Sequence, residues 1–268
     1  MSSRASRVAL VTGASSGFGL HIARRLAADG FRTFGTSRSE RPDAGAVSMR
    51  VLNVRDAASV QACVGAIEAE AGRIDVLINN AGVLDVGPAE EHGVEGVRAV
   101  FETNVLGTVR TTLAALPGMR ARRSGRIVTI GSLASHIAPP GEAAYAASKF
   151  AVAGYFEALG YEVAPFGIAV SVVDPGFFQT GIGASVPPVR GAIADYDDFR
   201  AAIRAAVADN LDRGGDPADV GAVVSRVVAA RRPRARYRVG TDAVWLPRLR
   251  RLLPERAFAW GVRREFGL

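Results

Sequence analysis

The sequence predicts a single α/β domain, with a doubly wound parallel sheet of about seven strands and helices on both faces. Short, almost continuously apolar segments alternate with helical stretches along most of the chain. Strands of this kind are buried on both faces, and right-handed crossovers then place helices on either side of the sheet. The 268 residues, 49% hydrophobic and 22% charged, suit one large soluble domain.

The order of the elements supports this fold. Helices are expected over Leu20–Ala28 and Ala57–Ala71, and each is followed by a glycine stop, Gly30 and Gly72. The alternation lapses over residues 176–215, which we interpret as either a substrate lid or a disordered loop. The expected strands are Val8–Thr12, Thr33–Thr36, Val47–Leu52, Val76–Ile78, Ile127–Ile130, Ile168–Val173 and Tyr237–Val239.

The excess of basic over acidic residues lies entirely in the C-terminal part of the chain. The net charge is +7, but residues 231–268 hold eleven arginines against three acidic residues, a net of +8. The other 230 residues carry 22 basic and 23 acidic groups, a net of −1. Because a nucleic-acid surface needs basic groups across its reading face, nucleic acid is excluded as a partner.

The sequence favours a cytoplasmic protein. Cys63 is the only cysteine, so no intramolecular disulfide can form and a reducing compartment is the simplest expectation. The residues before Val8 are too few for the apolar core of a leader. No stretch approaches the roughly 20 apolar residues that span a bilayer.

A glycine-rich turn lies between the first expected strand and the first helix. Glycines there allow the backbone to approach a pyrophosphate, and the helix N-terminus offers N–H donors. The spacing is not the GxGxxG of the dinucleotide fingerprint, so the position between strand and helix carries the interpretation, with a plain tight turn as the alternative. The residues expected to bind a dinucleotide here are Gly13, Ser15, Ser16, Gly17, Phe18 and Gly19.

The end of the second expected strand indicates NADP(H). An acidic residue there would bind the free ribose hydroxyl of NAD, whereas this chain has Ser37 followed by Arg38. A guanidinium can grip a 2′-phosphate with two charge-assisted bonds. A solvated arginine is the alternative, and Glu40 keeps NAD(H) as the minority cofactor.

Three residues form a candidate catalytic group. Lys149 is the only lysine among 33 basic residues, and it follows Tyr145 by four positions, so both share one helix face. Ser132 follows a strand at the carboxyl edge of the sheet, where its hydroxyl could hold a substrate oxygen. Lowering a phenol pKa from about 10 to about 7 needs about 4 kcal/mol, roughly what an ammonium about 4 Å away supplies. Each residue has an ordinary structural role by itself, but the set favours acid/base chemistry, and no metal site is expected.

Together these residues resemble the short-chain dehydrogenase/reductase family, in its compact Rossmann-type form. The resemblance runs from Val8 to Val239, with the landmarks in the family's order. These landmarks are Thr12–Gly19, Asn79–Gly82, Asn104, Ser132, Tyr145 with Lys149, Pro175–Gly176 and Thr180.

The resemblance implies roles that the spacing alone does not assign. It implies that Asn104 holds a water linking Lys149 to solvent, and that Lys149 also bonds the nicotinamide ribose. It further implies cofactor contacts for Asn80, Ala81 and Gly82 on the adenine side and for Val173, Pro175, Gly176 and Thr180 around the nicotinamide. Family members often place aspartate after the third strand; here Asn53 and Val54 stand there, which affects only the detail of the adenine contact. None of the histidines fits the catalytic group: His21 is expected on the cofactor helix and His92 in a loop, and an edge of the substrate mouth is only an alternative for His136, which lies just after Ser132.

Residues 240–268 form a basic, amphipathic C-terminal extension, similar to that of the hydroxysteroid and retinol dehydrogenase-like branch. Its leucines and aromatic rings give a rough helical stripe with arginines beside it. It is expected to pack on its own domain or on a sister subunit of a homodimer or homotetramer. Lining an apolar substrate cleft and resting on an anionic membrane surface are the alternatives. Burial of Trp245, Phe258, Trp260 and Phe266 would indicate a bulky apolar substrate.

The expected activity is NADP(H)-dependent interconversion of a ketone or aldehyde and an alcohol. Tyr145 is the expected acid/base, Ser132 holds the substrate oxygen, and the small-molecule substrate is apolar. The alternatives are a non-catalytic protein that senses NADP(H) and an NAD-dependent alcohol or steroid dehydrogenase. An epimerase or dehydratase of the longer family branch would need a further substrate domain, for which this chain has no room.

Overall fold

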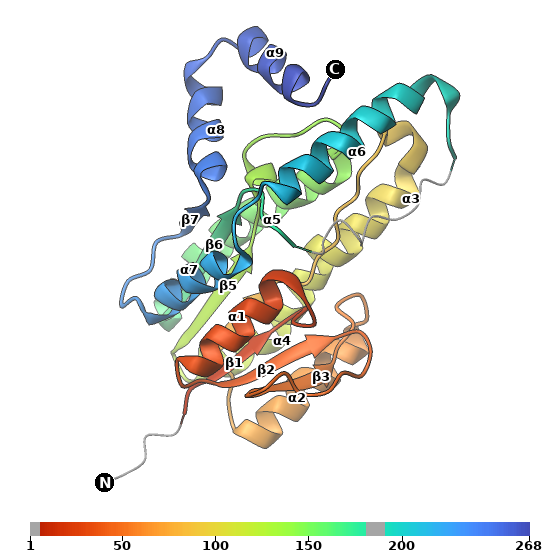
Figure 1. Cartoon of the computed structure of the whole chain (residues 1–268). Coiled ribbons are helices and arrows are strands. Elements are labelled where there is room, and N and C mark those ends of the chain that lie inside the picture. The colour runs from red at the N-terminus through yellow and green to blue at the C-terminus, as the bar shows by residue number, and fades with distance from the viewer. Residues whose placement is uncertain (1–5, 181–190) are drawn as a thin grey trace.

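Seven parallel strands form the centre of the computed structural model, which describes residues 6–180 and 191–268. Their order is β3-β2-β1-β4-β5-β6-β7, so the direction of winding reverses between β1 and β4 (Figure 1). The strands are β1 (Val8–Val11), β2 (Arg32–Ser37), β3 (Val47–Val51), β4 (Val76–Asn79), β5 (Gly125–Ile130), β6 (Ile168–Pro175) and β7 (Arg236–Val239). All seven expected strands are confirmed, with ends that differ by one or two residues.

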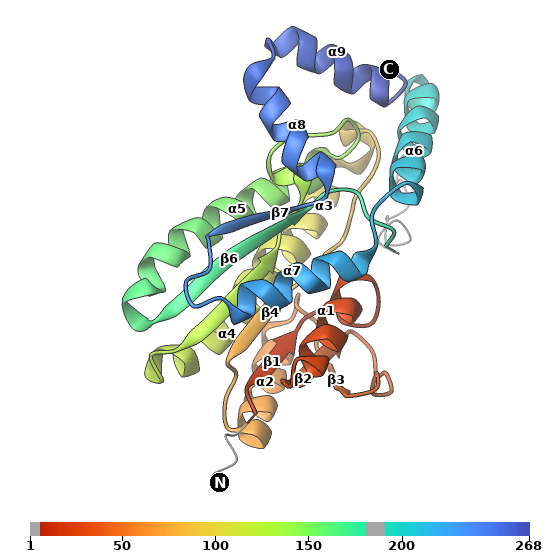
Figure 2. The same ribbon diagram turned by 60° about the vertical axis from the view of Figure 1, so that its left-hand side comes forward.

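Helices cover both faces of the sheet (Figures 1 and 2). One face carries α1 (Gly17–Ala28) and α7 (Pro217–Ala229). The opposite face carries α2 (Ala57–Ala71), α4 (Thr108–Ala121) and α5 (Ala143–Val163). The helix α3 (Ala89–Phe101) lies along α5, and the π-helical segment η1 (Glu102–Gly107) joins it to α4. In the described parts of the chain, 3-10 turns lie at η2 (Leu133–Ser135), η3 (Ala164–Phe166) and η5 (Ala194–Tyr196).

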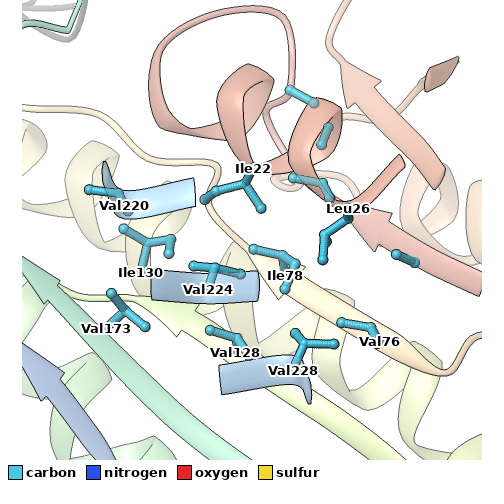
Figure 3. Packing of buried hydrophobic residues seen from close by; sticks show 14 of the residues in the cluster. Ile22, Leu26, Val76, Ile78, Val128, Ile130, Val173, Val220, Val224 and Val228 are labelled. Carbon is cyan, nitrogen blue, oxygen red and sulfur yellow. The ribbon is translucent and has the colours of Figure 1, made fainter. Parts of the chain in front are cut away.

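The core between α1, α7 and the sheet fixes the glycine turn in place. Ile22 and Leu26 of α1 meet Val220, Val224 and Val228 of α7, and all five side chains are buried (Figure 3). Fully burying an aliphatic side chain contributes about 1.5–3 kcal/mol, so this contact holds α1 firmly against the strands. The N-terminus of α1 is thereby held at the carboxyl edge of the sheet, beside the switch point where ligands bind in doubly wound folds.

Two expectations about local structure are wrong. Within the stretch interpreted as irregular, residues 197–212 form the regular helix α6 (Asp197–Asp212), while residues 181–190 of the expected lid lie outside the described residues. In α6, the apolar side chains of Ile203 and Val207 are four positions apart and are buried. The polar residues around them hide this helical pattern in the sequence. His92 lies in α3, not in a loop, with Nδ1 2.6 Å from Oδ2 of Asp85.

The C-terminal residues form an arch, which we define as α8 (Thr241–Leu252), α9 (Glu255–Glu265) and the residues up to Leu268. It rises beyond β7 and returns to the side of α6, where Phe266 packs with Ile203 and Val207 (Figure 2). The expected burial of the aromatic rings is only partly correct, because Trp245 is 58% exposed and Trp260 is 63% exposed. Among the described residues, no helix combines the length and apolar character needed to cross a membrane.

Candidate active site

A cleft of about 450 Å³ runs from the glycine turn to Tyr145 and Lys149. Of the residues expected to bind the cofactor, it is lined by Gly13, Ser15, Ser16, Gly17, Phe18, Ser37, Arg38, Asn53, Val54, Asn80, Ala81, Gly82, Tyr145, Lys149 and Thr180. Gly19 does not line the cleft, and Val173 is wholly buried in the core. Pro175 and Gly176 line a smaller neighbouring pocket instead.

The backbone of the glycine turn requires glycine at three positions. Gly13 and Gly17 have φ angles of +66° and +50°, which favour glycine. A Cβ at Gly19 would lie 2.2 Å from the Gly13 carbonyl oxygen, so that position also requires glycine. The Asn80 amide donates to the carbonyl oxygens of Thr12 and Gly13, both at 3.0 Å, and holds the turn closed.

The N-terminus of α1 fits a pyrophosphate. Its N-cap residue, Ser16, makes no side-chain capping bond, and the first turn holds no acidic residue. The N–H groups of this turn therefore remain available to an anion at the positive end of the helix dipole. The turn, the cleft and the open helix end together fit a dinucleotide.

Two arginines line the cleft near Ser37 and Asn53, away from Tyr145 and Lys149. The Ser37 hydroxyl is engaged locally, because it donates to the Ser39 carbonyl oxygen at 2.7 Å and accepts from the Ser39 N–H at 3.2 Å. Arg38 is exposed and lines the cleft, as does Arg55, which the sequence analysis did not single out. The sequence does carry an indication that Arg55 lines the cleft, because it lies two residues after Asn53, beyond the end of the neighbouring strand.

The candidate catalytic residues meet where β5 ends and α5 begins. Ser132 is the N-cap of η2, two residues after the end of β5, and its Oγ accepts from the Ala134 N–H at 3.1 Å. Tyr145 and Lys149 lie on successive turns of α5, with the Lys149 Nζ 5.6 Å from the centre of the Tyr145 ring. The Lys149 Nζ donates to the Ile130 carbonyl oxygen at 2.9 Å.

Burial, not Lys149, dominates the titration of Tyr145. Burial raises the pKa of Tyr145 well above its ordinary value of 10, the Ser132 hydroxyl lowers it, and Glu142 and Asp174 raise it further. Burial also lowers the pKa of Lys149 to about 8, against the opposing effect of Asp174. The expected lowering of the Tyr145 pKa by Lys149 is therefore wrong for the chain itself, because the cost of ionising a buried phenol outweighs it.

Asn104 lies in η1 and is hydrogen-bonded to Ser148, the residue before Lys149. Its Oδ1 accepts from the Val83 N–H at 2.8 Å, and its Nδ2 donates to the Val83 carbonyl oxygen at 2.9 Å and to the Ser148 Oγ at 3.0 Å. Ser148 precedes Lys149 on α5, so Asn104 ties the π-helical segment to the helix that carries the lysine. Its implied role in a proton relay remains a prediction.

A small pocket of about 70 Å³ adjoins the cleft, and Tyr145 lines both cavities. Ser132 and Glu142 also line this catalytic pocket, whose other walls are mostly apolar. Glu142 was not predicted from the sequence, although its place three residues before Tyr145, as the N-cap residue of α5, brings it to the same pocket.

Asp174 is a second residue that the sequence analysis missed. It is fully buried, and its Oδ1 accepts from the Ser132 N–H at 3.2 Å. Its Oδ2 binds His136 Nε2 at 2.9 Å and Arg236 Nε at 3.0 Å. His136 is thus held by Asp174 and does not line the catalytic pocket, which does not support the alternative that it edges the substrate mouth.

The buried Glu142 predicts a pH-dependent stability. Burial raises its pKa from 4.5 to about 7, so the folded state binds more protons than the unfolded state between these values. Its contribution is fully present below pH 4.5 and is lost as pH rises through about 7, a change of about 3 kcal/mol. We expect Glu142→Gln to gain about that much unfolding free energy over wild type between pH 4 and pH 8, measured by denaturant unfolding. An equal difference between the proteins at both pH values would contradict this.

Comparison with known proteins places these features in a family. Residues 7–190 match the short-chain dehydrogenase family. The chain is 40% identical over 238 residues to a 3-ketodihydrosphingosine reductase from Bacteroides thetaiotaomicron, a match covering 87% of this chain and 88% of the relative. A short-chain dehydrogenase from Streptomyces avermitilis superimposes with a TM-score of 0.82 at 34% identity, covering 97% and 98% of the two chains. An actinorhodin polyketide ketoreductase solved with NADPH gives a TM-score of 0.75 at 35% identity, covering 89% and 97%.

Proposed function

The chain belongs to the short-chain dehydrogenase family, and we propose that it is an NADP(H)-dependent oxidoreductase that interconverts an apolar ketone or aldehyde with its alcohol. The observation that carries this proposal is the position of Tyr145, which lines both the cofactor cleft and the catalytic pocket. A group at that junction can exchange a proton with a substrate held beside the nicotinamide. The names of the 3-ketodihydrosphingosine reductase and the polyketide ketoreductase support action on a ketone.

The residues of the chain have separate tasks in this reaction. The dinucleotide, when bound, supplies or accepts the hydride. Ser132 holds the carbonyl oxygen by a hydrogen bond, and the Tyr145 phenol donates its proton to that oxygen as negative charge develops there. Because burial keeps the phenol protonated at neutral pH, Tyr145 is suited to act as the acid in the direction of reduction. Lys149 binds the nicotinamide ribose, and Asn104 positions the helix that carries this lysine.

Turnover distinguishes this function from that of a protein that only senses NADP(H). We expect consumption of NADPH, followed at 340 nm, with at least one member of a panel of long-chain, cyclic and short ketones. Binding of NADPH without consumption by any of them would favour the sensing protein.

The arch supports an apolar substrate. Beneath it lies a cavity of about 530 Å³, lined mainly by apolar and aromatic side chains from α8, α9 and the 137–139 loop. Pro139 and Phe177 line both this cavity and the catalytic pocket, so the two adjoin. The catalytic pocket has room for little beyond the reacting carbonyl, and we propose that the apolar body of the substrate lies under the arch.

Trp245→Ala is expected to weaken activity selectively on long ketones. Trp245 lines the cavity under the arch, so its loss removes contact with two or three methylenes at about 0.8 kcal/mol each, lowering kcat/KM about 10- to 60-fold. Activity on a short ketone changes much less. Trp260→Ala is the matched control, because Trp260 is exposed and does not line the cavity. A similar loss on long and short ketones, or in both variants, would remove the arch from the substrate site.

Truncation after Gly240 removes the whole arch. The activity of the truncated protein on long ketones and its mass in solution, which reports the homo-oligomeric state, are then compared with those of wild type. Loss of long-ketone activity at unchanged mass would support the substrate role. A change of mass would instead assign the arch to a subunit contact.

A further inference from the structure

Glu142 is a buried carboxylate with no partner among the described residues. It is 5% exposed, and it lines the catalytic pocket with Ser132 and Tyr145. Its backbone is engaged, because its N–H donates to Pro139 and its carbonyl oxygen accepts from Ala146. Glu142 is the N-cap residue of α5, but its side chain makes no capping bond and no other hydrogen bond or ion pair with any described residue. Because Glu142 lines the catalytic pocket, a bound ligand can supply the donor that its carboxylate lacks among the described residues.

Among the described residues, no neighbouring cation is placed to donate to Glu142. The Lys149 Nζ is bonded to the Ile130 carbonyl oxygen and belongs to the cofactor cleft. Arg236 and His136 are both held by Asp174, so neither is available to Glu142. Glu142 is also the one charged residue among the described residues that line the catalytic pocket. The electrostatic field in the pocket therefore favours a cation.

The geometry limits where this cation can sit. Glu142 is the N-cap residue of α5 and Tyr145 lies in the first turn of that helix, and both side chains line the same small pocket. With about 70 Å³ available, only a few heavy atoms separate a carbonyl held by Tyr145 from a group held by Glu142.

We propose that Glu142 binds a protonated amine carried close to the carbonyl group, so that the substrate is an amino ketone with an apolar tail. This inference rests on the proposed function, since it assigns a second anchor at the same site. A hydroxyl would satisfy one oxygen of Glu142, but it would leave the buried charge uncompensated. An ammonium group supplies both the donors and the opposite charge. Burial raises the pKa of Glu142 to about 7, and a bound ammonium would hold the carboxylate ionised at neutral pH.

The test compares three ketones with the same alkyl chain, bearing an amine, a hydroxyl or hydrogen on the carbon next to the carbonyl. In wild type, kcat/KM should be about 10- to 100-fold higher for the amino ketone than for the unsubstituted ketone, with the hydroxy ketone between them. Glu142→Gln keeps the size of the side chain and removes its charge, and it should reduce this ratio to near one. Glu157→Gln, on the exposed side of the same helix, should leave the ratio unchanged.

A binding measurement makes the test independent of turnover. The amino alcohol should bind the NADP-loaded Tyr145→Phe protein, measured by calorimetry, and adding Glu142→Gln should weaken that binding about 10- to 100-fold. Equal turnover of the amino and unsubstituted ketones by wild type would overturn the role of Glu142 while leaving the reductase intact. Lack of turnover of all three, with intact binding of the amino alcohol, would instead count against the proposed reaction.

Discussion

Tyr145→Phe is expected to lower kcat about 10²- to 10⁴-fold while leaving NADPH binding nearly unchanged, because positioned proton transfer typically contributes that much to a rate. The substitution removes one hydroxyl and keeps the ring, which is buried at the junction of the two cavities. Fluorescence titration with NADPH measures binding, and single-turnover kinetics with a ketone substrate measure the chemical step.

Two further variants make this result specific. Tyr155→Phe is the matched control, because Tyr155 is a partly exposed tyrosine of the same helix, away from both cavities. Lys149→Arg should also be severely impaired, since a larger guanidinium cannot keep the contact of the buried Nζ with the Ile130 carbonyl oxygen. A Tyr145→Phe protein that retains more than about a tenth of the wild-type rate would rule out the acid/base assignment.

The fold could be predicted because its signals are local. Strands buried on both faces, such as Val8–Val11 and Val76–Asn79, are apolar at all or nearly all positions, and the glycine after α2 ends that helix in the left-handed region. The grouping of Ser132, Tyr145 and Lys149 could also be predicted, because parallel strands end at one edge and residues four apart share a helix face. Helix α6 was missed because only two of its side chains are buried, which leaves a weak apolar pattern.

The electrostatics of the site could not be predicted from spacing. The distance between Tyr145 and Lys149 along the helix suggested a lowered phenol pKa, but burial reverses that direction. Burial depends on how α5 packs against the rest of the chain, which no local pattern reports. Asp174 was missed for the same reason, because its partners Ser132, His136 and Arg236 come together only across strands and loops distant in sequence.

The double substitution of Ser37→Asp with Arg38→Ala is expected to reverse the cofactor preference. A charge-assisted contact with the 2′-phosphate contributes roughly 1.5–3 kcal/mol, so loss of Arg38 lowers kcat/KM for NADPH about 10- to 100-fold. An aspartate at position 37 can keep the local bond from the Ser39 N–H, while its charge repels the phosphate and its oxygens accept from a free ribose hydroxyl. Together these changes should move the ratio of kcat/KM for NADPH over NADH by about 10²- to 10³-fold.

Matched arginine variants show whether position or charge alone sets this preference. Arg55→Ala should produce a smaller fall than Arg38→Ala, because Arg55 lines the same end of the cleft from the neighbouring strand end. Arg41→Ala should leave the ratio unchanged, since Arg41 is exposed and does not line the cleft, although it carries the same charge only three residues away. Equal losses in all three variants would indicate general attraction of the phosphate by positive charge. Equal use of NADH and NADPH by wild type would mean that Arg38 is a solvated arginine and that the preference for NADP(H) is absent.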